Sequence, residues 1–466
     1  MKILVHTINY FPELTGIGKY SGEFANWLAT RGHEVRVVTA PPYYPEWKIS
    51  PGYTNGWKKE QVQGTRGKEQ GTRHKVQRAS GETGEILGTC SLNLSPVLVY
   101  RCPLWVPEKP SGLKRILHLL SFAISSFPVM LRQIFWKPDV VFVVEPPLFC
   151  SPAALLVARL SGAKSWLHVQ DFEVDAAFDL GILPKGRIQQ IILAAESWLM
   201  RRFDRVSSIS GKMIEKLGEK KVTESRQILF PNWVDVSSIF PLECSPMRGD
   251  LGISDDRCVC LYSGNMGEKQ GLEILIEAAR IITETRCKKQ GERGEGQETS
   301  ARERGGSGEE ERVRSEAGRV VFVMCGNGGA RDRLLELAQG LTNILWLPLQ
   351  PLEKLNELLN MADIHLLPQR ADAADLVMPS KLTGMLASGK PVIATAKSGT
   401  ELAEVVSSCG RVVEPGNADA LAMEIMAFAD DKDARRIAGE AGRKYALDYL
   451  SVDAILLSVE KAMQCV

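Results

Sequence analysis

The chain has 466 residues, of which 44% are hydrophobic, and a formal net charge of +1 at pH 7. This length predicts two large domains, and the apolar content is enough for a full core in each. The nearly balanced charge excludes a general electrostatic drive toward nucleic acid, so we expect no nucleic-acid partner. The first residues run directly into an apolar strand without a signal-peptide pattern, which predicts a cytoplasmic protein.

Short apolar strands alternate with helices along the first half, from the strand at 2–8 onward. Continuous apolar runs such as 140–144 are typical of parallel strands that are covered on both faces. The alternation breaks near residues 241–252, and a second series follows. We therefore predict two doubly wound parallel sheets, in an N-terminal domain over about 1–240 and a C-terminal domain over about 250–440.

Three further segments complete the predicted organisation. Helices over 441–466 are expected to pack back on the first domain. The stretches at about 59–89 and 288–318 are rich in Gly, Glu, Lys and Arg and contain few apolar residues. They cannot bury enough surface to offset their ordering entropy, so they are predicted to be disordered insertions.

A glycine-containing loop joins the first strand to the first helix, with Gly16, Gly18 and Gly22 where the helix begins. Glycine there lets backbone N–H groups approach a phosphate. The spacing is not G-x-G-x-x-G, and the second strand ends without an acidic residue for a ribose diol. A dinucleotide site is therefore disfavoured. A loop that approaches a ligand phosphate and an ordinary tight turn fit this stretch equally well.

Residues 378–395 predict a loop, a helix, a turn and a buried strand. Pro379 and Ser380 suit a helix N-terminus, where the serine oxygen can accept a backbone N–H, and Gly389 ends the helix. Ser380 and Lys381 then lie at a helix tip whose N–H groups, dipole and ammonium favour an anion. A capped helix with a surface lysine is the alternative.

Polar side chains surround the end of the strand at 166–169. His168 lies in this strand, and Gln170, Asp171 and Glu173 follow where open α/β sheets bind ligands. A carboxylate there would deprotonate or orient an acceptor hydroxyl; Asp171 is the first choice and Glu173 the second. No cluster has metal-ligand spacing, so we expect neither a metal nor another cofactor.

Residues 112–137 contain basic residues before an apolar run at 116–131, and then Arg132 and Trp136. The uninterrupted apolar part is shorter than the ~20 residues that span a bilayer. Two interpretations fit: a helix lying in the interface of the cytoplasmic membrane, or a buried helical hairpin.

Six segments together resemble the family-4 retaining glycosyltransferases of the GT-B fold, and within them a group from colanic acid biosynthesis. These segments are 9–20, 31–47, 168–171, 230–233, 262–271 and 379–383. The resemblance implies an α/β protein with two doubly wound Rossmann-like domains facing across a cleft. It also implies transfer of a sugar, with retention, from a nucleotide-sugar donor to a lipid-linked saccharide acceptor in exopolysaccharide biosynthesis. GDP-fucose is the donor that it suggests.

The resemblance also implies roles for single residues. The catalytic candidates are Asp171, Glu173 and His168. The donor-binding candidates are Gly16, Gly18, Asn265, Lys269, Gly326, Asp375, Ser380 and Lys381. Lys269 lies beside the position of a family lysine that binds phosphate, and Asn265 stands where many members have arginine.

The chain departs from the family at three positions. Leu376 and Gly384 stand where the family has two glutamates, and Gln170 stands where it has a histidine. Asp372 and Asp375 lie near enough in sequence to supply a carboxylate to the donor sugar. Two other functions therefore stay open: a nucleotide-sugar epimerase of the same fold, and a non-catalytic subunit of a polysaccharide-assembly complex.

Overall fold

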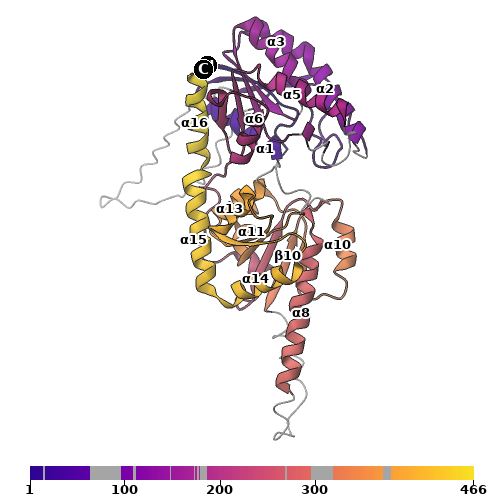
Figure 1. The fold of residues 1–466 in the computed structure, drawn as a ribbon, viewed down its shortest axis with the longest axis vertical. Helices are drawn as coiled ribbons and strands as arrows, with labels where there is room; N and C mark the ends of the chain where they lie inside the picture. Colours follow the sequence, from indigo (N-terminus) through magenta and orange to yellow (C-terminus); the bar gives the residue numbers. More distant parts are fainter. Residues whose placement is uncertain are drawn as a thin grey trace, which may run out of the picture. The chain divides into compact units, whose positions relative to one another are not determined.

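The chain folds into two compact units, each built on its own β-sheet (Figure 1). The computed structural model describes residues 1–13, 16–62, 96–108, 112–146, 148–172, 174–175, 178, 186–267, 270–294, 319–370 and 379–465. The first unit comprises Met1–Ile209, Ile214–Phe230 and Leu456–Val466, and the second Ser210–Met213 and Pro231–Ile455. Residues 231–240 and 441–455 thus belong to the second unit, and the last residues of the chain belong to the first.

The first unit contains an eight-stranded sheet in the order β3-β4-β2-β1-β5-β6-β7-β8. Neighbouring strands are parallel, except that the edge strand β3 pairs antiparallel with β4. The strands are β1 Lys2–His6, β2 Glu34–Thr39, β3 Lys58–Val62, β4 Val97–Arg101, β5 Val140–Glu145, β6 Lys164–Val169, β7 Arg205–Ser208 and β8 Gln227–Leu229. Its α-helices are α1 Gly16–Thr30, α2 Gly112–Gln133, α3 Ser151–Ser161, α5 Arg187–Met200 and α6 Gly211–Glu219.

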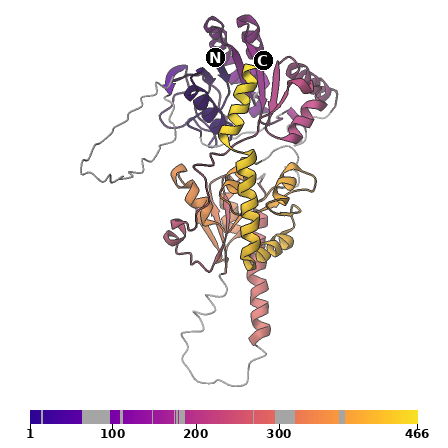
Figure 2. The ribbon, with the colours of Figure 1, turned by 90° about the vertical axis from the view of Figure 1, so that its left-hand side faces the viewer.

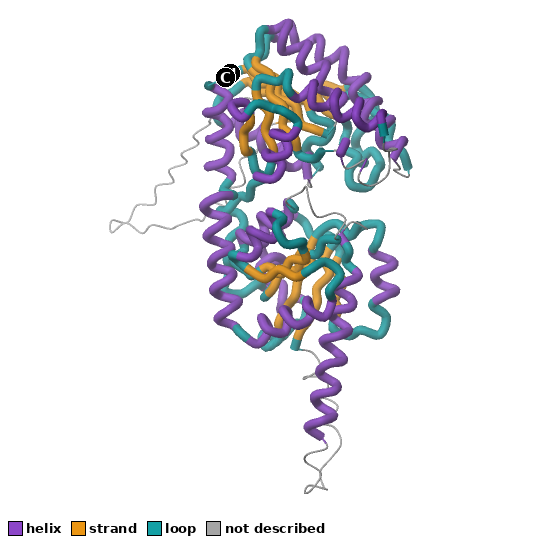
Figure 3. Tube along the Cα trace, in the orientation of Figure 1, coloured by secondary structure: helices purple, strands orange, loops and turns teal. Residues whose placement is uncertain are grey.

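The second unit contains a six-stranded, fully parallel sheet in the order β11-β10-β9-β12-β13-β14. The strands are β9 Cys258–Ser263, β10 Val320–Cys325, β11 Ile344–Leu347, β12 Ile364–Leu367, β13 Val392–Thr395 and β14 Gly410–Val413. The helices are α7 Pro246–Asp250, α8 Glu273–Gly294, α10 Arg331–Leu337, α11 Leu355–Met361, α12 Ser380–Ala387, α13 Glu401–Ser407, α14 Ala418–Asp430, α15 Lys432–Tyr449 and, continuing into the first unit, α16 Val452–Gln464. Figures 2 and 3 show helices on both faces of the sheet in each unit.

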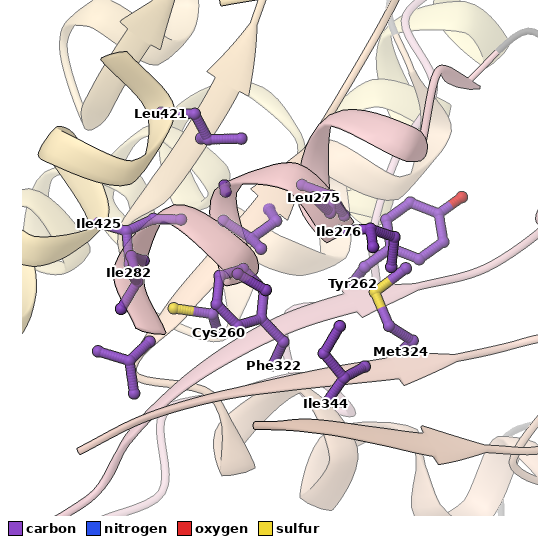
Figure 4. Close-up of a cluster of buried hydrophobic side chains, with 14 of the residues drawn as sticks. Cys260, Tyr262, Leu275, Ile276, Ile282, Phe322, Met324, Ile344, Leu421 and Ile425 are labelled. Carbon is purple, nitrogen blue, oxygen red and sulfur yellow. The ribbon is translucent and has the colours of Figure 1, made fainter. Parts of the chain in front are cut away.

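Burial follows this layered arrangement. Every residue of β5 and of β10 is buried, as expected for central strands with both faces covered. In the second unit, apolar side chains from β9 and β10 pack against the inner faces of α8 and α14 (Figure 4). The alternation of strands and helices in the sequence therefore predicted both sheets correctly.

In each sheet, the strand order reverses beside the first strand of the unit. β1 lies between β2 and β5, and β9 lies between β10 and β12. Open α/β sheets bind ligands beyond the carboxyl ends of the strands at such a reversal. The loops after β1, β5, β9 and β12 are therefore where ligand-binding groups are expected.

The structure moves the boundaries of both predicted insertions. Residues 59–62 belong to β3, which is held at the sheet edge partly because Glu60 pairs with the buried Arg101 (2.8 Å). Residues 288–294 continue helix α8. The remaining residues of the two predicted insertions lie outside the described residues.

The hairpin interpretation of residues 112–137 is wrong. Gly112–Gln133 form one helix, α2, in which Pro128 does not end the helix, and a 3₁₀ turn at Ile134–Trp136 follows. Within the described part of the chain, Gly112–Trp136 is the one helix that is long and apolar enough to cross a membrane, judged by length and composition alone. Core helices of other proteins pass the same test.

Candidate active site

Two glycine-containing loops pack against each other at the carboxyl end of the second sheet. The backbone N–H of Gly264 donates to the carbonyl oxygen of Cys325 (2.9 Å), and that of Met266 donates to Asn327 (2.8 Å). A Cβ at Gly326 would lie 1.9 Å from the carbonyl oxygen of Gly264. Gly326, predicted as donor-binding, is thus required by the contact between the two backbones, whether or not a ligand binds there.

The side chain of Lys381, at the start of α12, lies against the first of these loops. Its Cε would be 2.4 Å from a Cβ at Gly264, so the lysine passes where only glycine leaves room. Its Nζ donates to the hydroxyl of Tyr262 (2.6 Å) and lies 4.4 Å from the centroid of that ring. Burial lowers the pKa of Lys381 from 10.5 to about 8. No carboxylate of the described residues forms an ion pair with this ammonium.

The N-terminus of α12 differs from the prediction in one respect. Ser380 is the first helical residue, Pro379 occupies the cap position, and no side chain among the described residues caps the helix. The serine cap expected from the sequence is therefore absent, because the helix starts one residue earlier than that role needs. The helix dipole and the Lys381 ammonium both favour an anion at this point.

The other donor-binding candidates of the second unit are less informative. Asn265 is exposed, and its backbone oxygen accepts a hydrogen bond from the Tyr262 hydroxyl (2.5 Å). Lys269 and Asp375 lie outside the described residues, as does Asp372. Lys381 is therefore the candidate whose surroundings the structure defines.

In the first unit, the two glycines of the loop before α1 have different roles. Gly16 has φ +55°, a conformation that favours glycine, and a Cβ there would meet nothing within 4 Å. This open space leaves room for a ligand. A Cβ at Gly18 would instead lie 2.6 Å from the Cβ of Glu13, so internal packing explains Gly18.

Glu13 is a buried carboxylate that the sequence analysis missed. It accepts the backbone N–H groups of Tyr43 (2.8 Å) and Tyr44 (3.0 Å) and the side-chain amide of Asn9 (2.8 Å). Burial raises its pKa, and these hydrogen bonds oppose the rise. Glu13 therefore joins the loop after β1 to the loop after β2. Its two backbone partners, Tyr43 and Tyr44, are 30 and 31 residues away, so no local pattern reveals these contacts.

His168, predicted as catalytic, is an internal residue of β6 and only 3% exposed. Its Nδ1 lies 2.9 Å from the Ser207 hydroxyl and its Nε2 lies 2.8 Å from the Gln170 amide nitrogen. The ring also packs against Phe230, 4.6 Å between centroids. Burial lowers the pKa of His168 to about 3, so the ring is neutral at physiological pH. These contacts favour a structural role over proton transfer to a substrate.

Asp171 lies directly beyond β6 and is partly exposed, as an acceptor-side base requires. Next to it, Phe172 is fully buried, and Asp175 pairs with Lys216 (3.0 Å) and Lys220 (2.7 Å). Its place beyond the end of β6 is compatible with the predicted acceptor-side role, which stays a prediction. Glu173, the second choice, lies outside the described residues.

Comparison with known proteins identifies the family of this chain. Residues 15–233 match the family model described as "Glycosyl transferase 4-like domain", and residues 245–445 match "Glycosyl transferases group 1". The chain is a family-4 glycosyltransferase. This membership confirms the family inferred from the sequence and decides against an epimerase.

Two relatives resemble this glycosyltransferase in sequence. WcaI of Escherichia coli (strain K12), a glycosyl transferase assigned by its name to colanic acid biosynthesis, is 40% identical over 432 residues, covering 90% of each chain. WbjE of Pseudomonas aeruginosa, named as a probable glycosyltransferase, is 22% identical over 290 residues, covering 61% of this chain and 64% of its own.

Solved structures share the fold of this glycosyltransferase over the whole chain. Sucrose-phosphate synthase from Thermosynechococcus elongatus has a TM-score of 0.67 at 14% identity, covering 100% of this chain and 98% of its own. HepE of Anabaena, in complex with UDP and glucose, has a TM-score of 0.62 at 13% identity and full coverage of both chains. At such identities the likeness establishes the fold alone, which is the predicted GT-B fold.

Proposed function

We propose that this glycosyltransferase moves a sugar from a nucleotide-sugar donor, GDP-fucose first among candidates, to a lipid-linked saccharide during exopolysaccharide assembly, with retention of configuration. The observation that carries the proposal is Lys381, a desolvated ammonium without a carboxylate partner among the described residues, beside the strand-order reversal of the second sheet. The identity to WcaI supports an acceptor of the surface-polysaccharide class.

The chemistry of the donor explains why a cation belongs there. Breaking a glycosyl–phosphate bond leaves negative charge on the departing diphosphate, and this charge grows toward the transition state. Lys381 and the N-terminus of α12 stabilise that charge without reorganisation, because both are fixed before the substrate binds. Lys269 and the open space beside the Cα of Gly16 are the further candidates for phosphate contacts.

On the acceptor side, Asp171 is the proposed base. Its carboxylate orients the acceptor hydroxyl and takes its proton as the new glycosidic bond forms. His168 does not compete for this role, because both ring nitrogens already have partners inside the first unit.

Helix α2 is the proposed site of peripheral membrane contact. Its exposed large apolar side chains recur every three or four residues, which places them on one face of the helix. They are Leu113, Leu117, Leu120, Ile124 and Phe127. Buried side chains such as Phe122 and Met130 form the opposite face. Basic residues at both ends suit a helix lying on an anionic lipid surface, where a lipid-linked acceptor is found.

The test is acceptor-dependent release of nucleotide. The purified full chain is incubated with a panel of nucleotide sugars, with and without lipid-linked saccharides. We expect release with one donor only when an acceptor is present, and the anomeric configuration of the product reports retention. Donor binding without release on any acceptor would instead support the non-catalytic subunit. Lys381→Ala should reduce release, whereas Lys354→Ala, at an exposed lysine of the same unit, should not.

A further inference from the structure

Tyr262 lies at the end of β9, where the core of the second unit meets the candidate donor site. Its side chain is fully buried. Figure 4 shows its ring at one end of the cluster that includes Leu275 and Met324, with the hydroxyl directed away from the other labelled side chains. The ring is therefore held by the core, and the hydroxyl is presented at a fixed point.

Two hydrogen bonds define what that hydroxyl does. It donates its proton to the backbone oxygen of Asn265 (2.5 Å), which leaves its oxygen free to accept from Lys381 Nζ (2.6 Å). The ring face also attracts the same ammonium, 4.4 Å from the centroid. One side chain thus connects the start of α12 to the loop after β9, although Tyr262 and Lys381 are 119 residues apart.

We infer that Tyr262 is a positioning residue for Lys381: its hydroxyl holds the ammonium, still charged, where the donor diphosphate arrives. This inference rests on the proposed function for its catalytic consequence, but the contact itself does not. Tyr262 is the first residue of the segment 262–271 that carries the family likeness, but that likeness assigned it no role.

The surroundings of Lys381 make this contact important. Among the described residues on α12, β9 and the two glycine loops, Tyr262 is the titratable group that contacts the Lys381 ammonium. Burial is the cause of the lowered pKa of Lys381. Charged side chains on the neighbouring segments at 268–269 and 371–378 lie outside the described residues. In a desolvated site, an accepting oxygen takes the place of a water molecule in solvating the ammonium. Removing that oxygen therefore destabilises the charged form of the lysine.

The inference predicts a change in titration. Tyr262→Phe keeps the ring and its packing but removes the oxygen. The charged form of Lys381 is then less stable, so its pKa falls below about 8. If turnover requires the charged lysine, activity is lost as pH rises through this pKa. The alkaline limb of kcat/KM should therefore move to lower pH in Tyr262→Phe.

The direct test measures the lysine rather than the reaction. The folded full chain is labelled competitively with acetic anhydride at a series of pH values, and mass spectrometry gives the reactivity of Lys381. We expect a lower midpoint in Tyr262→Phe than in the unmodified chain. Tyr100→Phe, which removes a hydroxyl in the first unit, should leave the Lys381 midpoint unchanged. An unchanged midpoint in Tyr262→Phe would overturn the inference.

A kinetic cycle separates positioning from a general structural effect. If Tyr262 acts through Lys381, Tyr262→Phe reduces kcat in the normal background and has no further effect in Lys381→Ala. Equal losses in both backgrounds would show that Tyr262 acts independently. If Lys381→Ala keeps normal turnover while the labelling midpoint still shifts in Tyr262→Phe, the proposed donor site fails and the positioning contact stands.

Discussion

Two lysines, one in each unit, share partial burial but differ in their surroundings. Lys220 of the first unit contacts Asp175 and Glu196. Burial lowers its pKa, but these two carboxylates raise it more, so the net shift is upward. Lys381 has a tyrosine hydroxyl in place of carboxylates, and burial alone lowers its pKa.

This difference in surroundings is what we expect between a structural lysine and one that binds an anionic ligand, as proposed for Lys381. Lys220 is neutralised within the protein, because it pairs with two carboxylates of its own unit. The Lys381 ammonium lacks an anion in the described part of its unit, and a bound diphosphate would supply one. Measurements on one lysine can therefore be designed with the other as the control.

The largest expected effects are on turnover. Lys381→Ala removes a preorganised cation and should lower kcat by about 10²–10³-fold. The substitution should weaken donor binding less than it slows turnover, because the negative charge that Lys381 stabilises grows in the transition state. Asp171→Asn should lower kcat by about 10²–10⁴-fold, as expected for loss of a general base.

The two variants differ in donor affinity, which calorimetric titration with the nucleotide sugar measures. Donor binding should be normal in Asp171→Asn, because that residue serves the acceptor, and weakened in Lys381→Ala. Turnover and donor affinity unchanged in Lys381→Ala would exclude Lys381 and direct the search to Gly16 and Lys269. Weakened donor binding in Asp171→Asn would contradict the assignment of the acceptor role.

The second prediction compares stability after the same substitution. Lys220→Met leaves Glu196 buried without its cation and should cost about 3–5 kcal/mol. Lys381→Met removes a cation that has no carboxylate partner among the described residues, so stability should be unchanged or higher. Denaturant unfolding at pH 7 measures both. Lys444→Met, at an exposed pair with Asp448, is the control and should change stability by less than about 0.5 kcal/mol.

Two outcomes would contradict this comparison. A marked loss of stability in Lys381→Met would mean that a carboxylate neutralises the ammonium, and the anion site would lose its support. A cost for Lys220→Met that does not shrink at acidic pH would be equally unexpected. Burial already raises the pKa of Glu196, so this carboxyl takes up a proton readily once its cation is gone.

The sequence predicted what depends on local pattern. Alternating strands and helices predicted both doubly wound sheets, and the helix-start pattern at Pro379 and Ser380 predicted the helix that carries Lys381. The sequence could not distinguish between kinds of glycine: Gly16 faces open space, whereas Gly18 and Gly326 make room for Glu13 and for the backbone of Gly264. Both kinds look alike in a one-dimensional pattern.

Long-range contacts explain the remaining differences. His168 looked accessible because it lies near a strand end, but Ser207 and Phe230 enclose it from distant parts of the chain. Tyr262 was overlooked because its partner Lys381 is 119 residues away in sequence, beyond the three strands β10, β11 and β12 and their helices. Such contacts are set by packing between elements, which local periodicity does not encode.

The third prediction concerns helix α2 and the turn that follows it, whose four basic residues are exposed. Replacing Lys114, Arg115, Arg132 and Lys137 with glutamine should weaken binding to anionic vesicles, at about 1 kcal/mol for each residue near the surface. Ile124→Glu, at a side chain 66% exposed, should also release the chain from vesicles. Flotation with phosphatidylserine-containing vesicles measures both. Unchanged flotation of all variants would mean that this face does not meet the membrane.

The smallest expected effect is the uptake of less than one proton by Lys381 when the donor binds. Between pH 8 and 10.5, free Lys381 is partly or largely neutral in the folded chain, because its pKa is about 8, whereas the unfolded chain keeps the ordinary value of 10.5. The unfolded state therefore binds more protons, and this group makes stability rise with pH over that window.

A bound diphosphate reverses the balance, because an adjacent anion favours the charged lysine and raises its pKa. Donor binding at pH 9 should thus take up protons, whereas at pH 6.5 this lysine is already charged and should take up none. Calorimetry in buffers of different ionisation enthalpy measures the uptake, with Lys220→Met as a control that should keep it and Lys381→Met as the variant that should lose it. Donor binding at pH 9 without proton uptake would mean that the diphosphate does not contact Lys381.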